Sequence, residues 1–272
     1  MTVQSLGESI RALAATPAGT PLPEETRAVV TTLLDALERG ELRAAEHGED
    51  GEWKAVPWVK QGILLAFRLG QIVDLSPGGD PRSFSFLDKD TMPPRQFSLS
   101  DGVRVVPGGS TVRRGAYLSP GVVCMPPMYV NVGSWVGAGT MIDSHALVGS
   151  CAQIGGVLEP INASPVVIED DVVVGGNCGV YEGTVVRKGA VLGAGVVLTR
   201  GTPVFDLVHE RVYRGSAAQP LVIPADAVVV PGARRVHGTY AEAEGISVQT
   251  PVIVKYRDDK TDLATTLEAW LR

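Results

Sequence analysis

The chain has 272 residues, of which 44% are hydrophobic and 20% are charged, and it carries a net charge of −6. This composition is typical of a globular protein with one large or two modest domains, and its negative charge excludes a general electrostatic attraction for nucleic acid. No apolar run approaches the roughly 18 residues of a membrane span, and the opening MTVQSLGESIRALAATPAGT lacks the basic and apolar regions of a signal peptide.

The 32 glycines, the 19 prolines and an aromatic content of only 6% indicate a turn-dense fold packed with small aliphatic side chains. The three cysteines, Cys124, Cys151 and Cys178, are an odd number without CxxC spacing. This pattern argues against a disulfide framework and a zinc site, and it fits a reducing compartment. We therefore expect a cytoplasmic protein that contacts neither membrane nor nucleic acid and holds no metal.

The first 100 residues carry helical signals. The segment PEETRAVVTTLLDALERG, residues 23–40, begins with a proline and two acids, has apolar residues at helical spacing and ends in glycine. The segment WVKQGILLAFRLG, residues 58–70, also ends in glycine and precedes the turn-rich SPGGDPRS. We predict a helix in each segment and a small helical domain over residues 1–100.

Apolar residues then recur at every sixth position, first over residues 106–154 and again over residues 168–198. Glycine dominates three residues after these positions, where it permits a positive φ at a corner, and Asp171 and Asn177 take the same place. Each hexad predicts one short strand with its apolar residue pointing inward, and three hexads make one rung. Residues 101–200 are therefore predicted to form a β-helix of about five rungs.

Beyond this repeat the chain reads as strands. The segments PVFDLVHERVYRG, AVVVPG and ISVQTPVIVKYRD are strand-like, and DLATTLEAWLR at the end predicts a helix. We expect residues 201–272 to form a small C-terminal extension.

Asp143 stands out in the repeat because it directly follows the inward-pointing Ile142. It is either a solvated corner acid or a catalytic carboxylate, and the pattern alone leaves both open. Glu182, beside Gly183 at a later corner, has the same two readings. Arg104, at the start of the repeat, is either a surface cation or a ligand for an anion.

The histidines exclude some chemistry. His145 takes a corner place usually held by glycine, and it is either an exposed corner residue or a general base of the kind that some β-helix acyltransferases use. His209 and His237 have no partner at metal-ligand spacing, so a zinc-dependent carbonic anhydrase is not expected. No Cys–His–acid constellation supports an acyl-enzyme route.

Several segments carry a resemblance to a known family: FSLSDGVRVVPGGSTVRRGAYL, MPPMYVNVGSWVGAGTMID, VGSCAQIG, GGVLEP, SPVVIEDDVVVGGN and the N-terminal WKAVPWVKQGILLAFRL. Over nearly the whole chain they resemble the bacterial tetrahydrodipicolinate N-succinyltransferases of lysine and diaminopimelate synthesis. GSCAQIG and GGVLEP are specific to these and closely related acyltransferases. The resemblance implies a mixed α/β fold class: a left-handed parallel β-helix of hexapeptide repeats with an N-terminal helical domain and a small C-terminal β extension.

The resemblance also implies an activity. Succinyl-CoA, a co-substrate with no tightly bound cofactor beside it, donates its succinyl group to the amine of ring-opened tetrahydrodipicolinate, giving N-succinyl-2-amino-6-oxopimelate and CoA. The family implies a homotrimer with sites between adjacent subunits. Arg104 matches the family's carboxylate-binding arginine, while Asp143 and Glu182 match acids that contact the acceptor and serve as general acid and base.

The chemistry agrees with these roles. An amine is mostly ammonium at neutral pH, so a nearby carboxylate can both hold and deprotonate it. The carboxylates of the acceptor and the phosphates of CoA call for cations. The candidates are Arg104, Arg187, Lys188, Arg200 and Lys255, of which we expect Lys188 and Arg200 to bind CoA.

The chain departs from the family after GSCAQIG, where about two further hexads are expected and Gly155 runs directly into Gly156. Either the loop accommodates a deletion or residues are missing from the sequence. Loss of two hexads predicts that the later strands start on another face, which would rotate Glu182 relative to Asp143. A second departure is His145, where the family usually has tryptophan.

Three functions remain open from the sequence. The first is succinyl transfer to tetrahydrodipicolinate, and the second is another CoA-dependent N-acyl transfer, including the acetylating branch of the pathway. The third is a non-catalytic β-helix scaffold. The long N-terminal domain favours the succinylating branch, although the sequence does not report donor selectivity.

Overall fold

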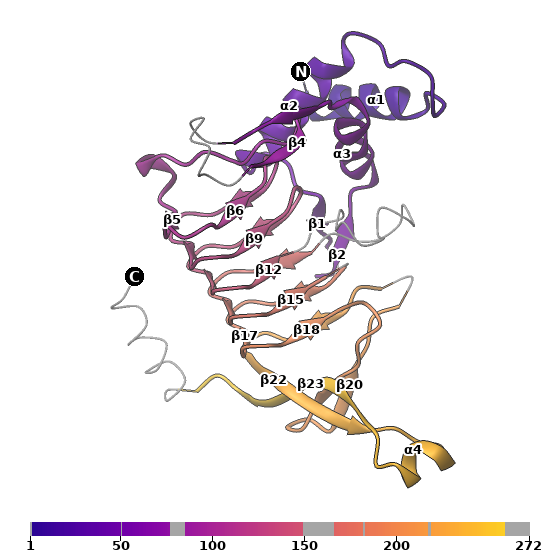
Figure 1. Cartoon of the computed structure of the whole chain (residues 1–272), viewed down its shortest axis with the longest axis vertical. Helices are drawn as coiled ribbons and strands as arrows, with labels where there is room; N and C mark the ends of the chain where they lie inside the picture. The colour runs from indigo at the N-terminus through magenta and orange to yellow at the C-terminus, as the bar shows by residue number, and fades with distance from the viewer. Residues whose placement is uncertain are drawn as a thin grey trace.

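The computed structural model describes residues 2–49, 51–76, 85–148, 166–181, 183–216 and 219–258. Figure 1 shows an elongated stack of short strands with helices at one end and a long two-stranded ribbon at the other. None of the helices in these ranges is long and apolar enough to cross a membrane.

Three helices form the N-terminal end: α1 (Val3–Ala14), α2 (Thr26–Glu38) and α3 (Pro57–Leu69). The hydroxyl of Thr2 caps α1 by accepting from the Ser5 N–H, and Pro57 opens α3, where its missing N–H costs nothing. Apolar faces of all three bury one core that includes Ile10, Leu33 and Ile63. The two helices expected from the sequence are confirmed, whereas α1 was not anticipated.

Two hairpins interrupt this helical region. Strand β1 (Ala45–His47) pairs antiparallel with β2 (Trp53–Ala55), and β3 (Ile72–Asp74) pairs with β4 (Leu87–Lys89). A short 3₁₀ helix, Leu99–Asp101, then leads into the repeat. The purely helical expectation missed both hairpins.

The hexads form a triangular coil of parallel two-residue strands, and each of its three faces is one sheet. Face 1 contains β5 (Arg104–Val105), β8 (Val123–Cys124), β11 (Met141–Ile142), β14 (Val173–Val174) and β17 (Val191–Leu192). Face 2 contains β6 (Thr111–Val112), β9 (Tyr129–Val130), β12 (Leu147–Val148), β15 (Gly179–Val180) and β18 (Val197–Leu198). Face 3 contains β7 (Tyr117–Leu118), β10 (Trp135–Val136), β13 (Val167–Ile168), β16 (Val185–Val186) and β21 (Val222–Ile223).

The second residue of most of these strands points inward, and their side chains form one continuous buried core. The corners bend through positive φ, as expected: His145 has a φ of 60°, Asp171 of 59° and Asn177 of 58°. Asparagine and aspartate tolerate this conformation better than most residues, whereas histidine adopts it less readily than glycine. The hexad pattern therefore predicted both the inward residues and the corners.

The strands on either side of residues 149–165, which lie outside the described ranges, stack on one another in register. Strand β13 stacks directly on β10, β14 on β11, and β15 on β12. The faces therefore follow in the same order before and after the gap. The expected rotation of Glu182 relative to the family stays a prediction, since Glu182 lies outside the described ranges. Ile154 and the GSCAQIG and GGVLEP motifs fall in the gap.

After the coil, β19 (Val204–Asp206), β20 (Arg211–Tyr213), β22 (Ala227–Arg235) and β23 (Ser247–Tyr256) extend face 1 into a nine-stranded sheet, with α4 (Thr239–Ala243) at the tip of the β22–β23 ribbon. Strand β22 stacks on β17 and β21 on β16, so coil columns continue past residue 200. The helix expected at the C-terminus lies outside the described residues.

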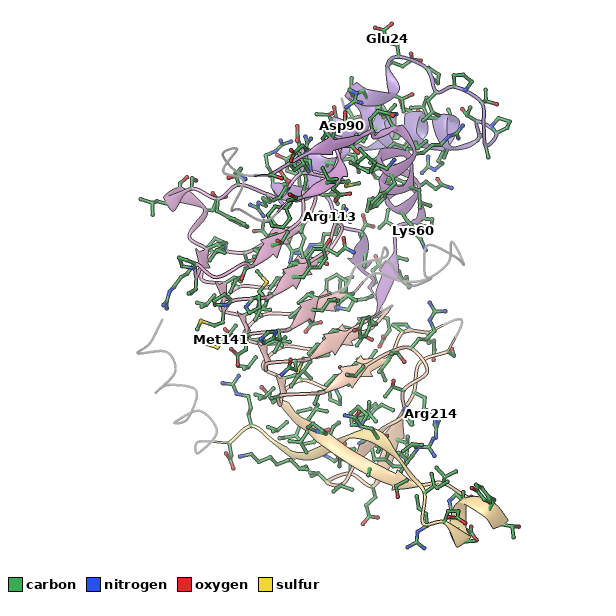
Figure 2. All side chains as sticks on the ribbon, in the orientation of Figure 1. Glu24, Lys60, Asp90, Arg113, Met141 and Arg214 are labelled. Atoms are coloured by element: carbon green, nitrogen blue, oxygen red, sulfur yellow. The ribbon has the colours of Figure 1, made fainter. Side chains whose placement is uncertain are left out.

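The β1–β2 hairpin covers face 3. Ala45 and Trp53 of the hairpin pack on Val167 and Val185 of the coil. In Figure 1 this hairpin runs alongside the coil, and in Figure 2 Met141 projects from the opposite flank. Faces 1 and 2 thus keep outward side chains that no described N-terminal helix covers along the middle of the coil.

Candidate functional site

Asp143 lies at the corner that follows β11 on face 1, and its side chain is half-buried. Its backbone N–H donates to the Val174 carbonyl at 2.8 Å, which fixes it in the coil. Its Oδ1 accepts from the Ser144 N–H at 2.7 Å, while Oδ2 accepts no hydrogen bond from any described residue. One oxygen therefore orients the carboxylate and the other is available for a ligand.

The corner of the next rung leaves this oxygen uncovered because it consists of Gly175 and Gly176. A Cβ on Gly176 would lie 2.8 Å from the Ser144 carbonyl oxygen and 3.8 Å from Oδ2 of Asp143. A Cβ on Gly175 would meet the Leu192 carbonyl at 2.7 Å. Backbone crowding therefore requires this glycine pair, and the sequence signal for it, VVVGGN, was not interpreted as part of a site.

Arg104 shares face 1 with Asp143. It is exposed on β5, and the ladder places it opposite Val123, which in turn is opposite Met141. Adjacent strands are about 4.8 Å apart, so the Arg104 strand lies about 10 Å from β11. A cation and a free carboxylate oxygen thus stand along one face, two rungs apart.

The neighbouring thiols are not suited to nucleophilic attack. Burial raises the pKa of Cys178, and the negative charge of Asp143 acts in the same direction. Burial also raises the pKa of Cys124 to about 12. Both described cysteines are unpaired and stay protonated, so neither supplies a thiolate.

His145 is exposed at the same corner as Asp143, and its backbone N–H donates to the Pro127 carbonyl at 2.5 Å. The described residues include no set of three or more His, Cys, Asp or Glu side chains placed to hold a metal ion. Glu182 lies outside the described ranges.

The expected CoA-binding cations are not brought together. Lys188 is exposed at the corner after β16, where its Nζ lies 3.7 Å from Oδ2 of Asp171. Arg200 is half-buried just after β18. Both lie in the later rungs of the coil, but at different corners.

Arg187, another candidate for phosphate, is already engaged. Its guanidinium lies 3.1 Å from Oε1 of Glu169 and donates to the Gly51 carbonyl at 3.0 Å. These contacts bind the hairpin to face 3. Arg187 therefore has a structural role, which the sequence did not indicate.

Comparisons with known proteins converge on one family. Residues 13–69 match a model described as the N-terminal part of tetrahydrodipicolinate N-succinyltransferase, and residues 165–200 match the hexapeptide repeat of succinyl-transferase. The 2,3,4,5-tetrahydropyridine-2,6-dicarboxylate N-succinyltransferase of Afipia carboxidovorans is 40% identical over 266 residues, 91% of this chain and 90% of the relative. Enzymes of the same name from Bradyrhizobium diazoefficiens and Nitrobacter hamburgensis are 38% and 40% identical over 267 residues, with the same coverage.

Among solved structures, a Campylobacter jejuni chain described as a tetrahydropyridine-2-carboxylate N-succinyltransferase matches with 14% identity and a TM-score of 0.40. The match covers 86% of this chain and 63% of that chain, and a likeness this low does not bear on the fold.

Proposed function

The chain belongs to the tetrahydrodipicolinate N-succinyltransferase family, and from this premise we propose how its residues carry out the reaction. It moves the succinyl group of succinyl-CoA to the amine of ring-opened tetrahydrodipicolinate, a step of lysine and diaminopimelate biosynthesis. The products are N-succinyl-2-amino-6-oxopimelate and CoA. The observation that carries this function is the 40% identity over 91% of the chain.

Asp143 is the proposed general base. Its free Oδ2 accepts a proton from the acceptor ammonium, and the freed amine attacks the thioester carbonyl of succinyl-CoA. The attack forms the carbon–nitrogen bond, and collapse of the tetrahedral intermediate breaks the carbon–sulfur bond. Of the two protons that the ammonium loses, one ends on the CoA thiol and the other passes to solvent. Glu182, outside the described residues, is proposed as the second acid of the pair.

Arg104 is the proposed ligand of an acceptor carboxylate. A guanidinium forms bidentate, charge-assisted hydrogen bonds with a carboxylate. Its place on face 1, two rungs from Asp143, suits an acceptor that carries its amine and a carboxylate at a distance from one another. Binding at both points orients the amine for attack.

Lys188 and Arg200 are proposed contacts for the phosphates of CoA. Lys188 is exposed and its partner Asp171 is also exposed, so a phosphate can displace that weak ion pair. Succinyl-CoA acts as a co-substrate, and we propose that no cofactor is tightly bound.

We propose that the coil is left-handed and that three copies associate through it, with sites between adjacent subunits. The support is an apolar stripe of half-buried side chains on face 1, namely Met141, Val173 and Val191, while each chain covers face 3 with its own hairpin. The unpaired cysteines Cys124 and Cys178 support a cytoplasmic location. The proposed domains are residues 1–100, 101–200 and 201–272.

The test is the release of CoA thiol from succinyl-CoA with and without L-2-aminopimelate, a stable acceptor, and with acetyl-CoA in parallel. Acceptor-dependent release with succinyl-CoA, well above that with acetyl-CoA, is expected. Release with acetyl-CoA alone would assign the chain to acetyl transfer, and no release with either donor would overturn the proposed activity.

A further inference from the structure

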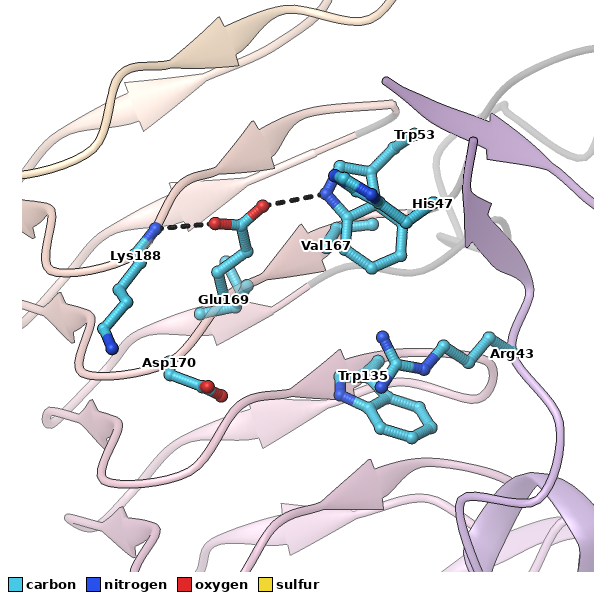
Figure 3. Close-up of a pocket in the computed structure, with 9 residues that line it drawn as sticks. Arg43, His47, Trp53, Trp135, Val167, Glu169, Asp170 and Lys188 are labelled. Carbon is cyan, nitrogen blue, oxygen red and sulfur yellow. Dashed lines mark hydrogen bonds between the residues drawn. The ribbon is translucent and has the colours of Figure 1, made fainter. Parts of the chain in front are cut away.

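A cavity of about 320 Å³ lies between face 3 and the chain that leads into the β1–β2 hairpin, beside the contact of the hairpin with the coil (Figure 3). Its lining includes Arg43, Trp53, Trp135, Asp170 and Lys188. This volume lies within the range of small-ligand sites.

Arg43 is the cation inside this cavity. Its guanidinium carbon lies 3.5 Å from the centroid of the Trp135 ring, and Figure 3 shows the two side chains stacked at the cavity edge. No residue in the described ranges forms a hydrogen bond or ion pair with its guanidinium. Burial lowers the pKa of Arg43, and Tyr117 and Asp170 act in the opposite direction. A half-buried guanidinium with free donors is suited to a carboxylate.

Asp170 supplies the opposite charge. Its Oδ1 accepts from the Ala138 N–H at 2.9 Å, whereas Oδ2 has no hydrogen-bond partner among the described residues. Asp170 acts electrostatically on Arg43, yet the two side chains form no ion pair within 4.0 Å. A gap therefore remains between a free cation and a free carboxylate oxygen.

Glu169, which lines the cavity, is held in place by three hydrogen bonds. Its Oε1 accepts from Nε1 of Trp53 at 2.9 Å and from Arg187 at 3.1 Å, and its Oε2 accepts from the Lys188 N–H at 2.8 Å. Figure 3 shows two of these bonds above the cavity. Glu169 therefore has a structural role, and Arg43 and Asp170 are the charged residues that can bind a ligand.

We propose that this cavity binds a small α-amino acid, with its carboxylate on Arg43 and its ammonium on Asp170. A zwitterion suits this lining better than a phosphate, because its ammonium can meet the free oxygen of Asp170, whereas a phosphate would place more negative charge beside that carboxylate.

The cavity lies away from the proposed catalytic carboxylate, and it shares only Lys188, a proposed CoA contact, with the acyl-transfer site described above. Asp143 lies at the corner after face 1, whereas the cavity lies over face 3 and closes against the hairpin of the same chain. The inference does not depend on the proposed function, and Asp143→Asn is expected to bind the amino acid normally.

The test is isothermal titration calorimetry of the full chain with L-glutamate and L-lysine, each with about ten non-hydrogen atoms, a size that suits the cavity. Glutarate, which lacks the amine, and cadaverine, which lacks the carboxylate, are titrated in parallel. Quenching of tryptophan fluorescence reports the same event because Trp53 and Trp135 line the cavity. At least one amino acid is expected to bind tenfold or more tightly than either analogue.

The variants Arg43→Gln and Asp170→Asn are each expected to weaken that binding about tenfold or more. Asparagine can still accept from Ala138, so Asp170→Asn keeps the question answerable if Arg43→Gln does not fold. Arg39→Gln, which removes an exposed arginine outside the cavity, is the matched control and is expected to bind normally. Unchanged binding by both cavity variants, equal binding of glutarate, or no binding at millimolar concentrations would overturn the proposal.

Discussion

The hydroxyl of Tyr256 donates a hydrogen bond of 2.8 Å to Oδ2 of Asp206, joining the two strands β23 and β19 at a buried carboxylate. The same oxygen lies 2.9 Å from Nδ1 of His209, and Oδ1 accepts from the N–H groups of Val208 and His209. Burial acts to raise the pKa of Asp206, but the hydrogen bonds from His209 and Tyr256 outweigh it and lower the pKa to about 2. The C-terminal sheet is thus assembled around one ionised group.

This carboxylate makes stability depend on pH. Because its folded pKa of about 2 lies below the usual 3.8, its contribution is present above about pH 4 and is lost as the pH falls toward 2. Asp206→Asn is expected to lower the free energy of unfolding by roughly 2–3 kcal/mol at neutral pH. Urea unfolding of the parent chain and of Asp206→Asn, from neutral to strongly acidic pH, measures the free energy of unfolding of each. If the two proteins lost stability in parallel as the pH fell, Asp206 would not be the source of the pH dependence.

Asp143→Asn is expected to lower kcat by about 10²–10⁴-fold, because an amide cannot take the ammonium proton. Thermal stability is expected to change little, since the side chain is half-buried and its amide oxygen can still accept from Ser144. The rate of CoA release measures kcat, and differential scanning calorimetry measures thermal stability. Asp226→Asn, at an exposed corner with a φ of 59°, is the matched control and should retain full activity.

Glu169→Gln is expected to loosen the hairpin from face 3. The change removes the ion pair with Arg187, in which both side chains are only 20% exposed, and it weakens the bond from Trp53. The expected loss is roughly 1–3 kcal/mol in the free energy of unfolding. Glu41→Gln breaks the exposed pair with Arg39 and should cost less than about 1 kcal/mol, so equal effects would refute a structural role for Glu169.

Cys124 and Cys178 are expected to resist thiol reagents in the native protein at mildly alkaline pH. Both are buried, the pKa of Cys124 is raised to about 12, and that of Cys178 is also raised. In a Cys151→Ser background, labelling by a chromogenic disulfide should be about 100-fold or more slower than in urea. Rapid labelling of the native variant would show that one of the two sites is open.

Val173→Glu should disrupt the trimer that we propose. The substitution places a charge in the apolar stripe of face 1, and an unpaired charge in an interface costs several kcal/mol. Sedimentation of the parent chain is expected to give a species three times its mass of 28.6 kDa. Tyr240→Glu, on the exposed helix α4, is the control that should remain a trimer. A monomeric parent would eliminate sites shared between subunits.

The coil was predictable because its signal is local and repeated. Each hexad carries its own inward residue and corner, so the strand from Met141 to Ile142 and the positive φ of His145 follow from a few neighbouring letters. Asp143 was singled out by the same logic, since an acid directly follows the inward-pointing Ile142. Its free oxygen, by contrast, depends on the Gly175–Gly176 corner of the next rung, which lies more than thirty residues later.

The hairpin over face 3 could not be predicted in this way. The bond from Trp53 to Glu169 joins residues 116 positions apart, and nothing periodic links the two segments. Glu169 occupies the same repeat position as Asp143, so the repeat alone does not tell the two acids apart. The two acids differ only in the folded structure, where both oxygens of Glu169 accept hydrogen bonds, one of them from Trp53 of the hairpin, whereas Asp143 keeps one oxygen free.

The first and last strands of face 1 determine how large an assembly can become. One edge strand of this sheet is β5, which is only two residues long and carries the exposed Arg104. The other edge strand is β20, a short strand that begins with the exposed Arg211. A charged side chain at a sheet edge disfavours the addition of a further strand, so we do not expect one molecule to continue the coil of another end to end. Molecules are then expected to join side by side, which favours a closed ring of fixed size over an open fibre.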